Sequence, residues 1–304
     1  MKVIICDVGN ASSAIVVANS GYAMMIDCGS NSEKTNPVDI FYNQMSWTGA
    51  KPYVTANGAS YPLALLHITH PDDDHVRNSV EVFKRLTPYH LRRNYGEDFP
   101  DSESINKDYL SSFDNKYRED ATEIIDWGFD VNETCYIPVS ICTSDDKLKN
   151  KVRNNSSIVR YIKENGIGIL FGGDLESDGW ERLLKDNPAF LNCIKKNGVN
   201  ILVAPHHGHK SGFPKALFDE IGEVDVIIHS KDSEASKEGT DVSSQYQLYA
   251  KGHWYKSLNS QNNLYMGKVL TTRSNGNIYI ETFDPFNYSI FTDKASPNHL
   301  KLNI

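Results

Sequence analysis

The hydrophobic pattern of this chain consists mainly of short apolar runs that end at glycine, proline or a polar turn. Seven of these runs have the length of a strand: residues 3–9, 14–18, 22–27, 62–66, 167–171, 201–204 and 225–229. Runs of this length bounded by turn residues are typical of β-strands. The tight spacing of the first three predicts the start of an antiparallel sheet.

Three other segments carry apolar residues at the spacing of one helix face. The clearest runs from Val76 to Leu86, with apolar side chains at 76, 80, 83 and 86, and Pro88 ends it. Residues 180–191 and 214–221 predict two more helices. Because strands and helices alternate in both halves of the chain, the sequence predicts a mixed α/β fold.

Three stretches fit neither period, and we interpret them as insertions at about 31–60, 87–150 and 231–265. The first is rich in aromatic residues and predicts either a short helix or loop over the functional site or a cover for exposed sheet. The second is charged and predicted to be partly helical. The third is polar, and a mobile loop is the simplest interpretation. We expect a single domain over residues 1–304, because the candidate functional blocks extend from residue 3 to about residue 283.

Composition and charge narrow the function. The 304 residues contain no apolar run long enough to span a membrane and no basic start typical of a signal peptide, which predicts a soluble, cytoplasmic protein without membrane contact. The five cysteines form no C-x-x-C pair and are expected to be reduced thiols. A net charge of -8 argues against gripping nucleic acid by surface charge alone. It leaves a phosphodiester substrate open, since divalent cations would offset carboxylates in a pocket.

The candidate chemistry is concentrated in residues 70–75, His-Pro-Asp-Asp-Asp-His, directly after an apolar run. Imidazole and carboxylate are ligands for hard or borderline divalent cations. An acidic turn in solvent is the alternative, but it explains neither the flanking histidines nor the apolar lead-in. Further apolar runs end at Asp27, at Asp174 and at the pair His206-His207. Four strand ends of this kind suggest a sheet whose edges converge on one metal site.

In this order, the motifs resemble the metallo-β-lactamase fold superfamily. The branch most similar is the soluble domain of ComEC-like competence proteins, where aspartate replaces the second histidine of the usual His-x-His-x-Asp-His motif. Residues 7–16, 154–159 and 269–278 resemble that branch's opening strand and turn, Asn-rich segment and closing hairpin. The resemblance covers about half of the chain. It implies a four-layer αββα sandwich in which the insertion at 87–150 shapes substrate access.

The resemblance also distributes the ligands over two divalent cations. His70 and Asp72 would hold the first cation, and Asp74 and His75 the second. Asp174 would bridge them. One of His206 and His207 would complete the second site, while its neighbour faces substrate or stabilises the leaving group. Three residues would take part in catalysis: Asp74, His206 and His207. Asp27 would orient ligands through hydrogen bonds rather than bind metal itself.

One departure from the superfamily pattern bears on the metal. The histidine of the third motif is replaced by Asn154 or Asn155, so the first site is expected to hold fewer imidazoles, with Asn155 in a supporting position. Sites with more oxygen ligands admit manganese or magnesium beside zinc. The sequence therefore predicts one or two divalent ions, zinc or manganese with magnesium as a third candidate, and one ion held more tightly than the other.

Several polar residues near these motifs have two interpretations. His209 and Lys210 either meet a substrate phosphate or lie exposed. The basic run at 147–153 either contacts phosphates or is a solvated loop. His67 lies inside an apolar run and is predicted to be a core histidine, whereas the role of His229 stays open.

The leading functional hypothesis is a metal-dependent hydrolase of phosphodiesters that uses a metal-activated hydroxide. It would be a nuclease or a phosphodiesterase acting on nucleic acid or a small nucleotide. One alternative is hydrolysis of C–N, C–O or C–S bonds, because a fold alone does not define its chemistry. Another is a weakly catalytic binding or regulatory subunit with an unidentified protein partner, which the sequence Val76-Arg77-Asn78 after the motif favours. The retained histidines and carboxylates favour an enzyme.

Overall fold

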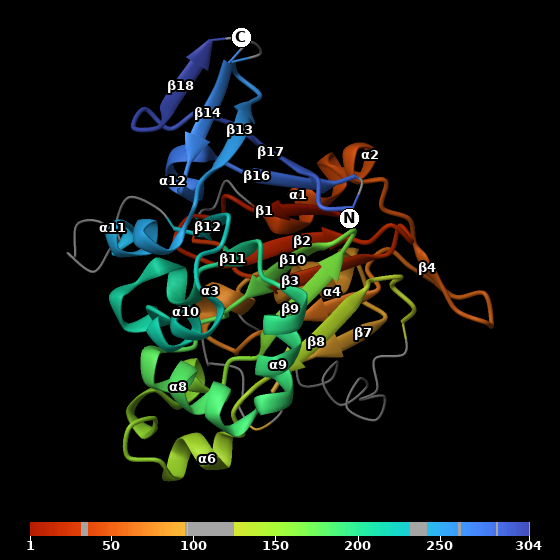
Figure 1. The fold of residues 1–304 in the computed structure, drawn as a ribbon. Coiled ribbons are helices and arrows are strands. Elements are labelled where there is room, and N and C mark those ends of the chain that lie inside the picture. The colour runs from red at the N-terminus through yellow and green to blue at the C-terminus, as the bar shows by residue number, and fades with distance from the viewer. Residues whose placement is uncertain are drawn as a thin grey trace.

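Two β-sheets packed face to face form the centre of the computed structural model (Figure 1), which describes residues 1–31, 36–94, 96, 125–231, 242–260, 263–283 and 285–303. The larger sheet has ten strands in the order β18 (Leu300–Asn303), β14 (Asn263–Gly267), β13 (His253–Ser257), β17 (Tyr288–Thr292), β16 (Ile278–Thr282), β1 (Lys2–Ile5), β2 (Ser13–Val17), β3 (Ala23–Cys28), β6 (Leu65–His67) and β7 (His90–Arg92). The smaller sheet has six: β15 (Val269–Thr271), β12 (Val226–His229), β11 (Ile201–Val203), β10 (Ile167–Phe171), β9 (Val159–Glu164) and β8 (Val131–Cys135).

The facing sides of the sheets share one buried apolar cluster. Side chains alternate along a strand, so Val3 and Ile5 point inward from β1 while Ile4 points outward. Ile169 and Phe171 of β10 belong to the same inner cluster. This cluster joins the two sheets face to face.

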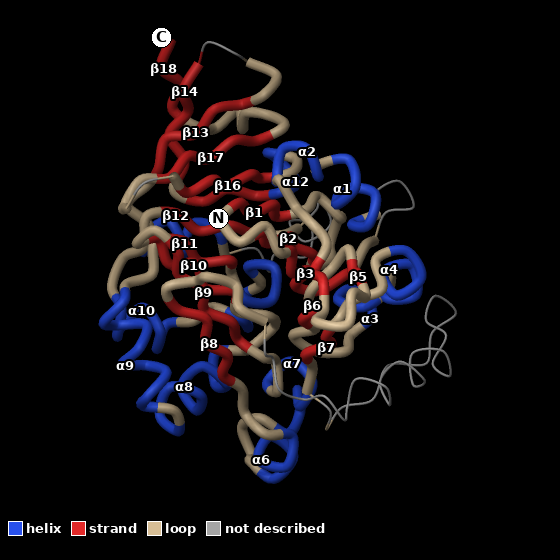
Figure 2. The backbone as a smooth tube through the Cα atoms, turned by 90° about the vertical axis from the view of Figure 1, so that its right-hand side faces the viewer, coloured by secondary structure: helices blue, strands red, loops and turns tan. Residues whose placement is uncertain are grey.

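Helices cover the two outer faces, as Figure 2 shows. The ten-stranded sheet carries α1 (Pro37–Asn43), α2 (Met45–Thr48), α3 (Asp73–Val76) and α4 (Ser79–Arg85). The six-stranded sheet carries α8 (Ser177–Asp186), α9 (Pro188–Asn197) and α10 (Lys215–Ile221). The predicted fold class, a mixed α/β fold with helices outside two packed sheets, is confirmed. No helix within the described ranges is long and apolar enough to cross a bilayer. The single domain over residues 1–304 stays a prediction.

Two of the predicted helices are interrupted. The helix expected at 76–86 is divided between α3 and α4, where the backbone N–H of Asn78 donates to Cys28 instead of continuing the helix. The helix expected at 180–191 is two helices, α8 and α9. Pro188 occupies the first turn of α9, where its missing N–H costs nothing. The helix predicted at 214–221 is confirmed as α10.

The insertions contain more regular structure than the sequence suggested. Residues 87–150 contribute the edge strands β7 and β8 and the helix α6 (Val139–Ser144); residues 95 and 97–124 lie outside the described part. The mobile loop expected at 231–265 is wrong for its described part, which forms α11 (Ser243–Tyr246), β13 and β14; residues 232–241, 261 and 262 are outside the description.

The hairpin expected at 269–278 is also wrong. β15 pairs with β12 in the smaller sheet, and β16 pairs with β1 in the larger one. The helix α12 (Thr272–Asn275) connects them, so this segment passes from one sheet to the other.

The aromatic stretch at 31–60 covers the larger sheet. Val38 and Phe41 of α1 share the outer apolar cluster with Ile15 and Leu66, and the ring of Trp47 lies edge-on to Tyr279 at 5.3 Å between centroids. Residues 32–35 are not described, and a small hairpin of β4 (Tyr53–Val54) and β5 (Ser60–Tyr61) completes the segment. Of the two interpretations left open, covering exposed sheet is the one found.

Candidate metal centre

The strands that end in candidate ligands run side by side and in the same direction. β3 pairs in parallel with β6 in the larger sheet, and β10 pairs in parallel with β11 in the smaller sheet. Parallel neighbours present their carboxyl ends at one edge, and side chains just beyond those ends lie close together. Asp27 is on β3, residues 70–75 follow β6, Asp174 follows β10, and the histidine pair follows β11.

Asp174 lies at the middle of this cluster, with two histidines on each side of its carboxylate. On the Oδ1 side, the Nε2 atom of His75 is at 3.1 Å and that of His207 at 3.8 Å. On the Oδ2 side, the Nε2 atom of His206 is at 3.7 Å and that of His70 at 3.9 Å. The two neighbouring histidines in the sequence therefore face opposite oxygens of one carboxylate.

A second carboxylate accompanies each pair of histidines. Asp74 Oδ2 is 3.2 Å from His207 Nε2, and Asp72 Oδ2 is 3.5 Å from His70 Nε2. The Oδ1 side is the tighter of the two, because Asp74, His75, Asp174 and His207 each offer one ligand atom within 4.8 Å of all the others. Each side thus presents two imidazoles, one aspartate of its own and a share of Asp174.

These residues fit a divalent cation. Ligand atoms at the corners of a tetrahedral site with bonds near 2.0–2.1 Å are about 3.3 Å apart, which is the range of the separations above. Among the described residues, the Nε2 atoms of His70 and His75 are buried and make no hydrogen bond of good geometry, although carboxylates lie close to both. A buried, unpaired nitrogen is costly unless an ion or water satisfies it, so the donor set itself favours a cation.

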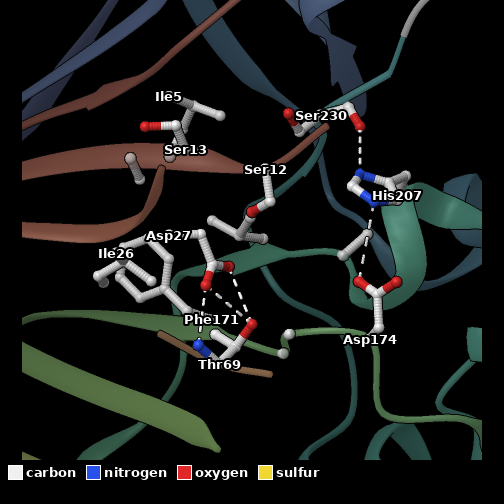
Figure 3. A pocket seen from close by; sticks show the side chains of 15 residues that line it. Ile5, Ser12, Ser13, Ile26, Asp27, Thr69, Phe171, Asp174, His207 and Ser230 are labelled. Carbon is white, nitrogen blue, oxygen red and sulfur yellow. Dashed lines mark hydrogen bonds and ion pairs between the residues drawn. The ribbon is translucent and has the colours of Figure 1, made fainter. Parts of the chain in front are cut away.

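Hydrogen bonds on the far side of the rings fix their orientation. His75 Nδ1 lies 2.8 Å from Asp27 Oδ2, and His207 Nδ1 donates to the carbonyl oxygen of Ser230 at 2.8 Å. His206 Nδ1 is 3.0 Å from the hydroxyl of Ser211. With Nδ1 engaged in each ring, Nε2 is the atom left to face the cluster. Figure 3 shows this arrangement for His207.

Asp27 is itself held by Thr69, a residue that was not selected from the sequence. The backbone N–H of Thr69 donates to Asp27 Oδ1 at 2.8 Å, and the Thr69 hydroxyl is 2.9 Å from Oδ2 (Figure 3). Asp27 has φ +57°, a left-handed conformation that is strained for a residue other than glycine. A polar residue in the buried stretch before His70 was the only available signal for Thr69.

The motif turn also depends on Gly29, directly after β3. A Cβ at this position would overlap the carbonyl group of Asp74. That carbonyl accepts a hydrogen bond from the backbone N–H of Ser12 at 3.0 Å, and the N–H of Gly29 donates to the carbonyl of Ser12 at 2.9 Å. Glycine thus allows three backbone segments to meet directly behind Asp74.

The histidine pair lies in a turn with unusual backbone angles. His206 and His207 have φ of +50° and +54°, and Gly208 also has a positive φ. The N–H of His206 donates to the carbonyl of Gly173 at 2.9 Å, which ties this turn to the Asp174 turn. The left-handed turn accounts for two consecutive side chains that approach Asp174 from different sides.

The carboxylates make the centre electrostatically negative. Burial disfavours charge on His75, yet three nearby aspartates, of which Asp174 acts most strongly, raise its pKa well above the usual value. Burial also disfavours charge on His207, but Asp174 and Asp74 raise its pKa. For His206, burial prevails and lowers the pKa to about 4. A cation between the aspartates would balance the charge that protons on His75 and His207 otherwise offset.

A small cavity of about 20 Å³ lies behind the centre, lined by residues that include Asp27, Asp174 and His207 (Figure 3). The side chain of Ser13 also lines it and is buried. This volume is sufficient for one water molecule.

Some predicted site residues lie elsewhere. The side-chain amide of Asn155 is buried and donates to the carbonyl of Leu148 at 3.3 Å, and a supporting position of Asn155 at the metal site stays a prediction. Asn154 lines a separate surface cavity. The sequence predicted too few imidazoles at the first site. In the structure, His206 and His70 both face Oδ2 of Asp174, so this side of the cluster has two imidazoles.

The remaining candidates surround the centre without joining it. The His209 ring packs against His206 at 4.9 Å between centroids and bonds Ser211, and Lys210 is exposed. His67 is a fully buried core residue 3.4 Å from Arg160, as predicted. His229 is buried against Gly208 and within 3.3 Å of the Ser243 hydroxyl.

No protein-family model matches the chain, and no curated protein matches it. Among solved structures, it is similar to the metallo-β-lactamase fold protein YhfI from Bacillus subtilis, with 11% identity and a TM-score of 0.42, over 91% of this chain and 99% of that one. Short-form human tRNase Z gives 14% identity and a TM-score of 0.33, over 67% of this chain and 77% of that one. Zn(2+)-bound PqqB from Methylobacterium extorquens gives 13% identity and a TM-score of 0.31, over 67% of this chain and 72% of that one. At such low identities and scores, any functional assignment has to rest on the site.

Proposed function

We propose that this protein is a metal-dependent hydrolase that acts on phosphodiesters, as a nuclease or a phosphodiesterase, and that it belongs to the ComEC-like branch of the metallo-β-lactamase fold superfamily. The observation that supports the proposal is the pair of matched donor sets on either side of Asp174. Branch membership rests on the motif resemblance alone.

In this proposal, two cations share Asp174. One would be held by His70, Asp72 and His206, and the other by Asp74, His75 and His207. Two imidazoles and two carboxylates on each side form a mixed nitrogen and oxygen set, which suits zinc or manganese better than magnesium. When bound, a pair of cations lowers the pKa of water and stabilises charge on both the attacking and leaving oxygens of a phosphoryl group.

The protein residues orient and expose this centre. Asp27 and Ser230 hold the imidazoles of His75 and His207 so that Nε2 points inward. Asp72 and Asp74 are 34% and 32% exposed, whereas Asp174 is 5% exposed. Substrate would therefore approach over the two exposed aspartates, with the bridging carboxylate behind them.

Metal analysis and an activity assay on one set of proteins test the proposal. The purified protein should contain close to two divalent ions per chain and hydrolyse bis(p-nitrophenyl) phosphate and single-stranded DNA. Replacing Asp74 with Asn should abolish both activities. The matched control is Asp73→Asn in the same turn, since the Asp73 carboxylate pairs with Arg77 at the surface.

Two results would contradict the proposal. The first is a folded protein that binds no divalent metal in the wild-type form. The second is a metal-loaded protein that leaves phosphodiesters intact but cleaves a thioester, lactone or lactam, which would favour the alternative chemistry at C–N, C–O or C–S bonds.

A further inference from the structure

A cationic cavity lies against the outer side of Asp72. It has a volume of about 330 Å³ and is lined by Asp72 and residues 149–154. Among the described residues that line it, Lys149, Lys151 and Arg153 are cationic and Asp72 is the only acid. In a chain with a net charge of -8, such a local excess of positive charge favours an anionic ligand.

The cavity and the candidate metal centre share the Asp72 carboxylate as a common wall. Its Oδ1 atom is 3.2 Å from Arg153 Nη1, and its Oδ2 atom is 3.5 Å from His70 Nε2. An anion held in the cavity would therefore be a near neighbour of a group bound at Asp174. The two positions are adjacent but distinct.

The two lysines are available to a ligand. Lys149 pairs with Asp146, but that aspartate is 92% exposed, and ion pairs at the surface contribute little. Lys151 is exposed, and the described residues show no ion pair for it. Lys147, from the same basic run, differs from both, because its ammonium lies 3.8 Å from Asp178 and 3.5 Å from Glu181, beside a different cavity.

The backbone that carries these cations is anchored. Leu148 is 1% exposed within the apolar cluster beneath α8, and its carbonyl accepts the Asn155 amide. The N–H of Ser156 donates to the carbonyl of Val152 at 2.8 Å. The rim is thus formed before any ligand binds, which lowers the entropy lost on binding.

We propose that this cavity binds a second phosphate group of the substrate, next to the phosphodiester that reacts at Asp174. The inference rests on the proposed function and makes it more specific: the preferred substrate carries several phosphates. A nucleic-acid strand and a nucleotide with a polyphosphate chain both meet this requirement. A diester with a single phosphate does not.

The test compares Lys149→Gln/Lys151→Gln with the wild-type protein and with the control Lys147→Gln, all metal-loaded. Hydrolysis is measured on bis(p-nitrophenyl) phosphate and on a short fluorescein-labelled oligothymidylate, with ATP as a competitor. For the double variant we expect kcat/KM on the oligothymidylate to fall roughly tenfold at low salt. The slope of its logarithm against the logarithm of the salt concentration should lessen by about 0.7, the value for one single-strand phosphate contact. Its rate on bis(p-nitrophenyl) phosphate should not change. The control variant should hydrolyse both substrates at the wild-type rate.

Each outcome separates the two proposals. Equal losses on both substrates, or an unchanged salt slope, would overturn the second-phosphate site while the proposed function stands. A weaker inhibition by ATP in the double variant assigns the site to polyphosphate nucleotides, and an unchanged inhibition with a loss on oligothymidylate assigns it to a strand. If no protein hydrolyses either substrate, the proposed function fails, and fluorescence anisotropy with the same oligothymidylate tests the cavity alone: equal affinity of wild type and double variant would overturn it.

Discussion

Replacing Gly29 with alanine should disturb the metal centre although residue 29 contributes no ligand. The new methyl group would overlap the Asp74 carbonyl. Restoring ordinary van der Waals separation requires a displacement on the order of 1–2 Å. Metal–ligand distances vary by only about 0.2 Å, so the displacement exceeds that tolerance several-fold. We expect metal affinity to fall by about 10–100-fold, the loss typical when the support of a ligand is removed.

A chelator-competition titration measures this change, and urea denaturation measures stability in parallel. Overpacking should cost about 1–3 kcal/mol. The matched control is Gly58→Ala, in the turn between β4 and β5, where φ is +84° and a Cβ would meet nothing within 4 Å. That variant should lose about 1 kcal/mol of stability through backbone strain and retain metal affinity. If folded Gly29→Ala binds metal as tightly as wild type, the close contact between residue 29 and the Asp74 carbonyl does not determine metal affinity.

Three further predictions concern other parts of the molecule. Thr69→Val removes a hydroxyl that supports Asp27 and should lower metal affinity about tenfold in the same titration; an unchanged affinity would show that the backbone N–H alone is sufficient. Asp74→Ala should reduce kcat/KM on a phosphodiester more than Asp72→Ala, because Asp74 belongs to the tighter donor set, and a reversed order would contradict that ranking. Trp180→Ala should cost about 3–5 kcal/mol in urea denaturation, since this side chain is completely buried; a loss below about 1 kcal/mol would mean that α8 contributes little to the core.

The sequence predicted those strands of the fold that are buried on both faces. β10 and β12 are continuous apolar runs and were recognised. β13 was missed because only alternate residues, such as Tyr255 and Ser257, are buried, and its outward positions are polar or exposed. A strand with one face in solvent lacks a continuous apolar run, so its sequence resembles that of a loop.

The candidate site, too, could be predicted from the sequence only in part. Ligand-type residues at strand ends could be selected from the sequence, because the apolar runs before them predicted strands whose ends converge on one site. The partners of His206 and His207 could not be assigned, since that depends on two positive φ angles. The contact of the Asn155 amide with a backbone carbonyl could not be predicted either, because such a contact has no sequence signature.

The left-handed turn at His206 and His207 affects how the protein would take up metal. Each such residue costs about 1–2 kcal/mol relative to a right-handed conformation, and two hydrogen bonds hold the turn, from the N–H of His206 to the carbonyl of Gly173 and from His207 Nδ1 to the carbonyl of Ser230. The strained backbone conformation that brings these ligands together therefore forms during folding and not when a cation binds. Uptake of a cation should then proceed with little backbone rearrangement, limited instead by the loss of bound water and of protons from the imidazoles.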